Sequence, residues 1–245
     1  MKKILVVILI LLVPVLGAKE LVVGVGKFEP FFIEKGETGV FIDIAKAAFD
    51  LLPQHHVKFV FMSNERIRIE LDEGNIDAGC NIFKESNVKA FLSVPLFRYT
   101  DVAVSFKKKN LSINSVAELA GKSIAAYQGA TDLLGMDFRL MAEANRSYSE
   151  HSKPFVTTNL LVNGSKDVRI GDIFIFLYDI NRPLHKREFT ADDFSVHYLW
   201  PDVYSHVGFR EKSIRDEFDQ AVKQLQENGV IDAIYHRYED VLRRH

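Results

Sequence analysis

Gly74-Asn75-Ile76-Asp77-Ala78 and Gly164-Ser165-Lys166-Asp167-Val168 are two similar stretches that lie about ninety residues apart in the chain. Each places a glycine after a segment that can be helical, and an aspartate three residues later, before an apolar run. Glycine supplies the left-handed residue that ends a helix, and the aspartate can accept hydrogen bonds from the turn as a strand begins. Any α/β protein contains such corners, but the repeat favours one helix-to-strand corner of this kind in each of two lobes.

Short apolar segments alternate with segments of helical periodicity on both sides of these corners. In the first run, strands are predicted at residues 21–25, 57–62 and 77–83, and helices at residues 44–52 and 65–73. The second run has a strand at 122–127, a helix at 131–144 and an apolar segment at 170–178. Ser213 is expected to cap a helix that Gly229 ends, ahead of a last helix. This alternation predicts a largely parallel α/β sheet whose ligands bind at the carboxyl ends of strands.

The N-terminus has the charge and hydropathy order of a secretory signal peptide. Lys2 and Lys3 are followed by an apolar run from Ile4 to Leu16 and then by Gly17-Ala18. The run is shorter than the roughly 18 residues that a membrane span needs. We therefore expect cleavage after Ala18 and a soluble, periplasmic mature protein. Because no cysteine lies near the cleavage region, no lipid anchor is expected.

The composition argues against several other classes of protein. Acidic and basic residues are interspersed and nearly balanced, with a formal net charge of −2, so nothing indicates a nucleic-acid surface. The single cysteine, Cys80, rules out an intramolecular disulfide and a cysteine-rich metal site, and the eight histidines have no metal-ligand spacing. We expect no metal, no cofactor and no nucleic-acid partner. The 47% apolar composition suffices for a core that holds the fold without disulfides.

Taken in order, these pieces resemble the family 3 bacterial solute-binding proteins, the periplasmic receptors of polar amino acid ABC transporters. The stretches that carry the resemblance are Pro30–Phe32, Gly39–Asp43, Gly74–Ala78, Ser93–Pro95, Leu119–Lys122, Gln128–Thr131, Gly164–Asp172 and residues 207–238. No single stretch is specific to the family. Their order and spacing, however, cover nearly the whole chain after the N-terminal apolar run.

The resemblance implies a periplasmic-binding-protein fold, in which two α/β lobes are joined by two crossing strands and close over a ligand. Lobe one would comprise residues 19–103 and 206–245, and lobe two residues 104–205. The protein would be a monomer that captures a small polar metabolite, either amino-acid-like or another small anion or zwitterion. Its other partner would be the membrane permease of an ABC transporter.

The turn Gln128-Gly129-Ala130-Thr131 precedes a predicted helix and has the features of an anion site. Thr131 can cap that helix while neighbouring backbone N–H groups point outward with the helix dipole. On local sequence alone, a plain helix cap is the alternative. The resemblance implies that this turn contacts the ligand, and that Asp172 receives the ligand's ammonium group.

Rings and polar side chains of lobe one complete the implied cleft. Phe28 and Phe31 are candidates for a ring wall that stacks on a ligand or makes cation–π contacts, although one of them can equally be a core residue. Asn81, in the strand after the first corner, is a further candidate for ligand binding.

The family's cleft arginine, which grips the carboxylate of an amino acid with a bidentate fork, has no obvious counterpart here. Residues 69–97 contain no arginine. Counting forward from the first corner puts Lys89 at that position, and counting back from Ser93 puts Ser86 there. Lysine supplies charge without the planar fork, so common α-amino acids are expected to bind weakly.

Two other functions fit the same pieces. A dehydratase of aromatic amino acid biosynthesis, of the cyclohexadienyl or arogenate type, resembles this family too, and needs a cleft acid or base. Glu29, Glu85 and Asp172 are the candidates for that role. A ligand-sensing module without transport is the other alternative. The sequence does not name the ligand.

Overall fold

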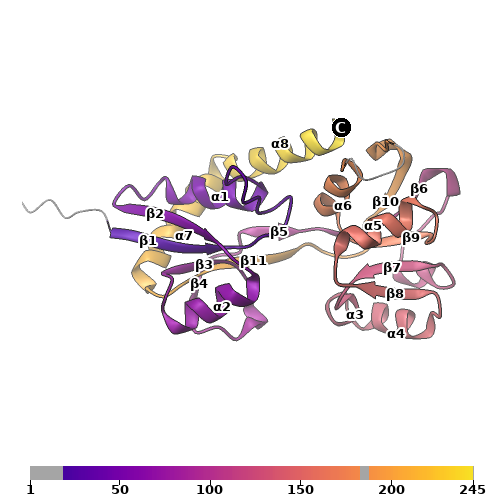
Figure 1. The fold of residues 1–245 in the computed structure, drawn as a ribbon, viewed down its shortest axis with the longest axis horizontal. Helices are drawn as coiled ribbons and strands as arrows, with labels where there is room; N and C mark the ends of the chain where they lie inside the picture. Colours follow the sequence, from indigo (N-terminus) through magenta and orange to yellow (C-terminus); the bar gives the residue numbers. More distant parts are fainter. Residues whose placement is uncertain (1–18, 183–187, 245) are drawn as a thin grey trace, which may run out of the picture.

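Two β-sheets, one in each half of a computed structural model, form the cores of two α/β lobes that lie end to end (Figure 1). The structure describes residues 19–182 and 188–244. The expected signal peptide, residues 1–18, lies outside the described residues. None of the described helices combines the length and apolar character that a bilayer crossing requires.

Lobe one is built on a sheet with the strand order β2-β1-β3-β11-β4, in which β1 is parallel to β2 and β3, and β11 is antiparallel to β3. Its strands are β1 (Lys19–Val25), β2 (His55–Phe61), β3 (Ala78–Ile82), β4 (Phe91–Leu92), β5 (Phe97–Tyr99), which pairs with β11, and β11 (Val203–Phe209). The helices are α1 (Val40–Phe49), α2 (Asn64–Glu73), the 3₁₀ turn η1 (Lys84–Ser86), α7 (Lys212–Glu227) and α8 (Val230–Arg244). Helix α2 covers one face of the sheet, and α1 and α7 cover the other (Figure 1).

Lobe two is built on a sheet with the strand order β10-β6-β9-β7-β8, in which β7 is parallel to β8 and β9. Its strands are β6 (Asp101–Phe106), β7 (Ile124–Tyr127), β8 (Tyr148–His151), β9 (Val168–Asp172) and β10 (Phe194–His197). The helices are α3 (Ala130–Leu133), α4 (Met136–Ala144), α5 (Pro154–Val162) and α6 (Ile173–Ile180), with 3₁₀ turns η2 (Lys107–Lys109), η3 (Val116–Leu119) and η4 (Ala191–Asp193). Helices α5 and α6 lie on one face and α3 and α4 on the other (Figure 1).

The chain crosses between the sheets twice, at Thr100 between β5 and β6 and at residues 198–202 between β10 and β11. The expected lobe boundaries, at residues 103/104 and 205/206, therefore fall within β6 and β11. Arg98, Thr100 and Asp101 interrupt the apolar pattern at the first crossing, and Pro201-Asp202 interrupts it at the second.

Both Gly-x-x-Asp corners are confirmed as helix-to-strand corners. Gly74 follows α2 with a φ of 84° and Gly164 follows α5 with a φ of 79°, a left-handed conformation that suits glycine. The structure gives both aspartates donors that lie outside the turn. Asp77 Oδ2 accepts from the backbone N–H of Val22 at 2.9 Å, and Asp167 Oδ2 from that of Ser123 at 3.1 Å. Each donor belongs to the neighbouring strand or its approach, so the aspartate ties two strands together.

Three expectations about helices differ from the structure. The single helix expected at 131–144 is two, α3 and α4, because Gly135 adopts a φ of 90° between them. The apolar segment 170–178 divides into β9 and α6 at Asp172, whose side chain caps α6. Helix α7 begins at Lys212 without a side-chain cap, so the capping box expected at Ser213 is not formed.

Helix α8 leaves lobe one and ends beside α6 of lobe two (Figure 1). Asn181 Nδ2, after α6, donates to the backbone oxygen of Leu242 at 2.7 Å. Tyr235 of α8 meets Phe174 of α6 with ring centroids 6.0 Å apart. As a result, one cluster of buried apolar residues runs continuously from lobe one through α8 into α5 and α6.

Candidate ligand-binding cleft

A cavity of about 610 Å³ lies between the lobes, within the usual size range of small-molecule sites. Lobe one contributes Arg68, Phe83, Glu85, Ser86, Tyr99 and Val203, and lobe two chiefly Asp101, Tyr127, Leu133, Pro154, Arg169 and Asp172. Strands β7 and β9 end at this cavity. Its position therefore agrees with the expectation that ligands bind where parallel strands have their carboxyl ends.

Aromatic rings form the wall that lobe one contributes. Phe83 and Tyr99 are stacked, with centroids 5.8 Å apart and planes inclined by 27°. Asn81, with a left-handed φ of 65°, accepts hydrogen bonds from the Tyr99 hydroxyl at 2.8 Å and from Ser205 Oγ at 2.7 Å. Asn81 thus positions Tyr99 through a hydrogen bond and is not itself among the residues that line the cavity. Neither Phe83 nor Tyr99 was predicted from the sequence as a cleft residue.

Asp172 lines the cleft, but its oxygens are already engaged by backbone groups. Oδ1 accepts from the N–H groups of Phe174 at 2.8 Å and Ile175 at 3.1 Å, and Oδ2 from that of Thr100 at 2.9 Å. The residue is 4% exposed, and burial together with the nearby charge of Asp101 raises its pKa to about 7. Asp172 therefore caps α6 and holds the crossing at Thr100; the ammonium contact expected of it stays a prediction.

Asp101 is a second acidic group in the cleft, and the sequence analysis missed it. It pairs in register with Asp172 across β6 and β9, and its Oδ2 accepts from the Tyr127 hydroxyl at 2.9 Å. Burial raises the pKa of Asp101. The available signal was an aspartate at the start of an otherwise apolar strand, a position where a buried charge needs a partner.

Arg169 supplies a buried positive charge at the floor of the cleft. Its side chain is among the largest that are fully buried, and Nη1 donates to the backbone oxygen of Asp172 at 2.9 Å. Burial lowers its pKa, whereas the charges of Asp179, Asp172 and Asp101 act to raise it. Its Nε is buried without a hydrogen-bond partner among the described residues. Gly171 makes room for the guanidinium, because a Cβ there would lie 3.1 Å from Nη2.

The turn at residues 128–131 does hold an anion, and that anion is the carboxylate of Glu150. Oε2 accepts from the N–H of Gly129 at 2.7 Å, and Oε1 accepts from the N–H and hydroxyl of Thr131 at 3.0 and 2.9 Å. The Tyr148 hydroxyl donates to Oε1 at 2.7 Å. Burial acts to raise the pKa of Glu150, but these hydrogen bonds outweigh it and lower the pKa. Gln128 donates its N–H to His151, and Ala130 is buried.

Of the other expected site residues, Ser86 lines the cleft and three do not. Phe31 is fully buried and stacks on Phe41 with centroids 4.1 Å apart, because it belongs to the core of lobe one. Phe28 is half-buried against that core. Lys89 is exposed, and its N–H donates to Asp72 Oδ1 at 2.8 Å. Counting back from Ser93 therefore gives the position, Ser86, that lies in the cleft.

The comparisons with known proteins agree with this architecture. The family model of bacterial extracellular solute-binding proteins, family 3, matches residues 21–240. The chain belongs to this family.

This family 3 protein has relatives among curated proteins and solved structures. It is 27% identical over 239 residues to the L-cystine-binding protein TcyJ of Bacillus subtilis, with 90% of this chain and 84% of that protein covered. The substrate-binding protein AbpA of Streptococcus pneumoniae, solved with L-arginine, superposes with a TM-score of 0.63 at 20% identity and covers 91% of this chain and 96% of that one. The GluR0 ligand-binding core, solved with L-glutamate, superposes with a TM-score of 0.68 at 17% identity. The match covers 90% of this chain and 98% of that one. These superpositions establish the two-lobed fold.

The acid and base candidates of the enzyme alternative are only partly in the cleft of this solute-binding protein. Glu85 and Asp172 line it, whereas Glu29 accepts a hydrogen bond from the Tyr178 hydroxyl at 2.7 Å and is not among the lining residues. The family and the relatives described above are binding proteins, not enzymes.

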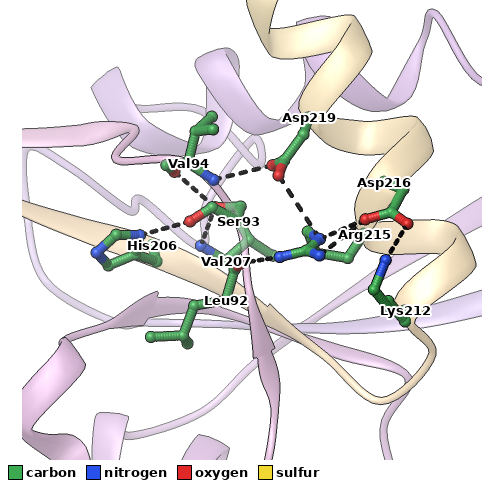
Figure 2. Close-up of polar contacts among 9 residues, drawn as sticks. All are labelled: Leu92, Ser93, Val94, His206, Val207, Lys212, Arg215, Asp216 and Asp219. Carbon is green, nitrogen blue, oxygen red and sulfur yellow. Dashed lines mark hydrogen bonds and ion pairs between the residues drawn. The ribbon is translucent and has the colours of Figure 1, made fainter.

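A serine, a histidine and an aspartate also lie close together in lobe one, as Figure 2 shows. They do not have the geometry of a nucleophilic triad. His206 Nδ1 contacts the backbone oxygen of Ser93 at 2.7 Å, while Ser93 Oγ donates to the backbone oxygen of Val94 at 2.8 Å. Asp219 Oδ1 accepts from the N–H of Val94 at 2.9 Å. The group therefore ties the loop after β4 to β11 and α7.

Proposed function

We propose that this family 3 protein is exported to the periplasm, binds a small polar solute between its lobes and delivers it to the permease of an ABC transporter. The observation that carries the proposal is the cleft of about 610 Å³, which both lobes line at the carboxyl ends of β7 and β9. The names of its relatives support the same role, since TcyJ is a cystine-binding protein and AbpA was solved with arginine bound.

Hinge closure is the conformational step that such a cleft requires. The sheets are connected by two strand crossings, and one of these, at Thr100, is held by Asp172 of lobe two. A solute that contacts Tyr99 of lobe one and Tyr127 of lobe two gains contacts from both lobes when they approach. It therefore binds the closed form more tightly than the open form and shifts the population toward closure.

Thermal-shift screening of the purified protein against polar metabolites tests the proposal. A solute at about a hundred times its Kd stabilises the native state by about 2.7 kcal/mol, which raises the melting temperature visibly. We expect such a shift without turnover of the solute. Product formation at enzymatic rates from the same solute would contradict the binding role.

A pair of variants tests whether the solute that causes the thermal shift binds in the cleft. Ser86→Trp fills space at a lining position and is expected to abolish the shift while the unliganded protein still folds and unfolds cooperatively, although it loses the bond from the Phe83 N–H. Lys89→Trp, three residues away on the exposed surface, is the control and should leave the shift intact. A shift that survives Ser86→Trp would show that the solute binds elsewhere.

A further inference from the structure

The carboxylate of Glu150 occupies the polar groups of the turn before α3, which lies between the cleft-lining residues Tyr127 and Leu133. Two backbone N–H groups and the hydroxyls of Thr131 and Tyr148 all donate to it. A ligand carboxylate would have to displace Glu150 from four hydrogen bonds, or lie beside its negative charge. Either event opposes binding, so this turn does not serve a carboxylate-bearing solute.

The arginines near the cleft are also engaged by groups of the chain itself. Arg169 is 1% exposed, and its Nη1 donates to the backbone oxygen of Asp172. Arg68 lines the mouth, and its guanidinium pairs with Glu65. Because residues 69–97 contain no arginine, the bidentate fork that would grip an α-carboxylate is not supplied by that segment either.

Of the two carboxylates that lobe two contributes to the cleft, Asp101 is the one with acceptor capacity left for a ligand, and lobe one adds the exposed Glu85. Both carboxylate oxygens of Asp172 accept hydrogen bonds, from three backbone N–H groups in total. The side chain of Asp101 accepts from the Tyr127 hydroxyl at Oδ2, which leaves Oδ1 for a ligand. The rings of Phe83 and Tyr99 line the same cavity. A partly buried carboxylate beside aromatic faces favours a cation, through a charge-assisted hydrogen bond and cation–π contacts.

We propose that the solute is an organic cation, an amine or guanidinium compound without an α-carboxylate. Asp101 receives its positive group, and Glu150 acts as an internal carboxylate that keeps the α-carboxylate of amino acids out. This inference rests on the proposed solute-binding function and narrows its ligand class. It also accounts for a cleft that has the family's two-lobed form but no free arginine fork in residues 69–97.

Calorimetric titration with two matched pairs of probes tests the inference. Agmatine is L-arginine without its α-carboxylate, and cadaverine is L-lysine without it. We expect at least one amine to bind the purified protein roughly tenfold or more tightly than its amino acid. Equal or tighter binding of L-arginine and L-lysine than of their amines would overturn the proposal.

Substitutions of the two residues separate their roles. Asp101→Asn keeps an oxygen for the Tyr127 hydroxyl and should weaken amine binding roughly tenfold or more. Glu150→Ala frees the turn and should strengthen L-arginine or L-lysine binding roughly tenfold without changing amine binding. Glu150→Gln, which keeps an acceptor for the two hydroxyls, repeats the test if the alanine variant does not fold. Exposed Asp192→Asn and Glu143→Ala are the matched controls.

The outcomes distinguish this inference from the function on which it rests. Amine affinity unchanged in Asp101→Asn, or amino acid affinity unchanged in both Glu150 variants, would overturn the corresponding assignment. If neither amine binds and the metabolite screen finds an anionic or neutral solute, the cation inference fails while the solute-binding function stands. If no solute in the screen stabilises the protein, the proposed function itself fails.

Discussion

Strands β3 and β9 begin in the same way and end differently. Each follows a left-handed glycine and an aspartate that bonds to a neighbouring strand. At the cleft, β3 ends near Asn81, which holds the ring of Tyr99, whereas β9 ends at Asp172, which caps α6 and binds Thr100. The comparison teaches that a short motif specifies the corner, while the chemistry at the far end of the strand depends on what packs there.

The largest expected effect is at the cleft end of β9. Asp172→Ala removes a helix cap and the acceptor of three backbone N–H groups, and should lower the free energy of unfolding by about 2–4 kcal/mol. Asn81→Ala, at the corresponding end of β3, should cost less because Asn81 accepts from two side-chain hydroxyls that can turn to other partners. Denaturant titration of both variants measures the difference. A larger cost for Asn81→Ala would reverse the proposed contrast.

The next effect compares the corner aspartates. Asp77→Ala and Asp167→Ala each leave a strand N–H without its carboxylate, and we expect each to cost about 1–3 kcal/mol. Chemical denaturation should give the larger value for Asp167→Ala, since Asp167 also accepts from Ser123 Oγ and pairs with Lys109. A larger cost for Asp77→Ala would show that these additional contacts of Asp167 contribute little to stability.

A smaller effect is expected at the corner glycines. An L-residue in the left-handed conformation costs roughly 1–2 kcal/mol, so Gly164→Ala should destabilise by about that amount. Gly74→Ala should lower the free energy of unfolding by more than this, because its Cβ would lie 2.8 Å from Cζ of Arg210. Arg210 is held in place there, since its Nη1 donates to the backbone oxygen of Gly74. Combining Gly74→Ala with Arg210→Ala in a double-mutant cycle measures this coupling. If the destabilisations of the two single variants add up to that of the double variant, Arg210 does not cause the extra cost of Gly74→Ala.

The two ends of β9 should also respond oppositely to pH. Hydrogen bonds from Lys109 and Ser123 lower the pKa of Asp167 to about 2, so its stabilisation is present above about pH 4 and is lost as the pH falls toward 2. Burial raises the pKa of Asp172 to about 7, so stability declines as the pH rises from about 4 through 7. Melting temperatures measured across this range should no longer fall below about pH 4 through this group in Asp167→Asn. In Asp172→Asn they should no longer decline between about pH 4 and 7. The Asp167 effect should be the smaller, since that side chain is 37% exposed.

Sequence reasoning succeeded where structure depends on local conformation. Glycine tolerates the left-handed turn without strain, so the corners at Gly74 and Gly164 were predictable, as were the alternating strands and helices and the two-lobed architecture. It failed at the start of α7, where Ser213 resembles a cap although the helix begins at Lys212, and at Gly135, where the helical periodicity of residues 131–144 was given more weight than the glycine.

The sequence by itself determined the backbone plan of this protein and the position of an anion-binding turn at residues 128–131. Tertiary structure decided which anion occupies that turn, because Glu150 reaches it from β8, the strand beside β7. It likewise placed Asp101 beside Tyr127 and Asp172 against Thr100, pairs separated by 26 and 72 residues. The physical reason is that a carboxylate takes its donors from whichever strands adjoin it, and the strand order of the sheet, which no local pattern encodes, sets those neighbours.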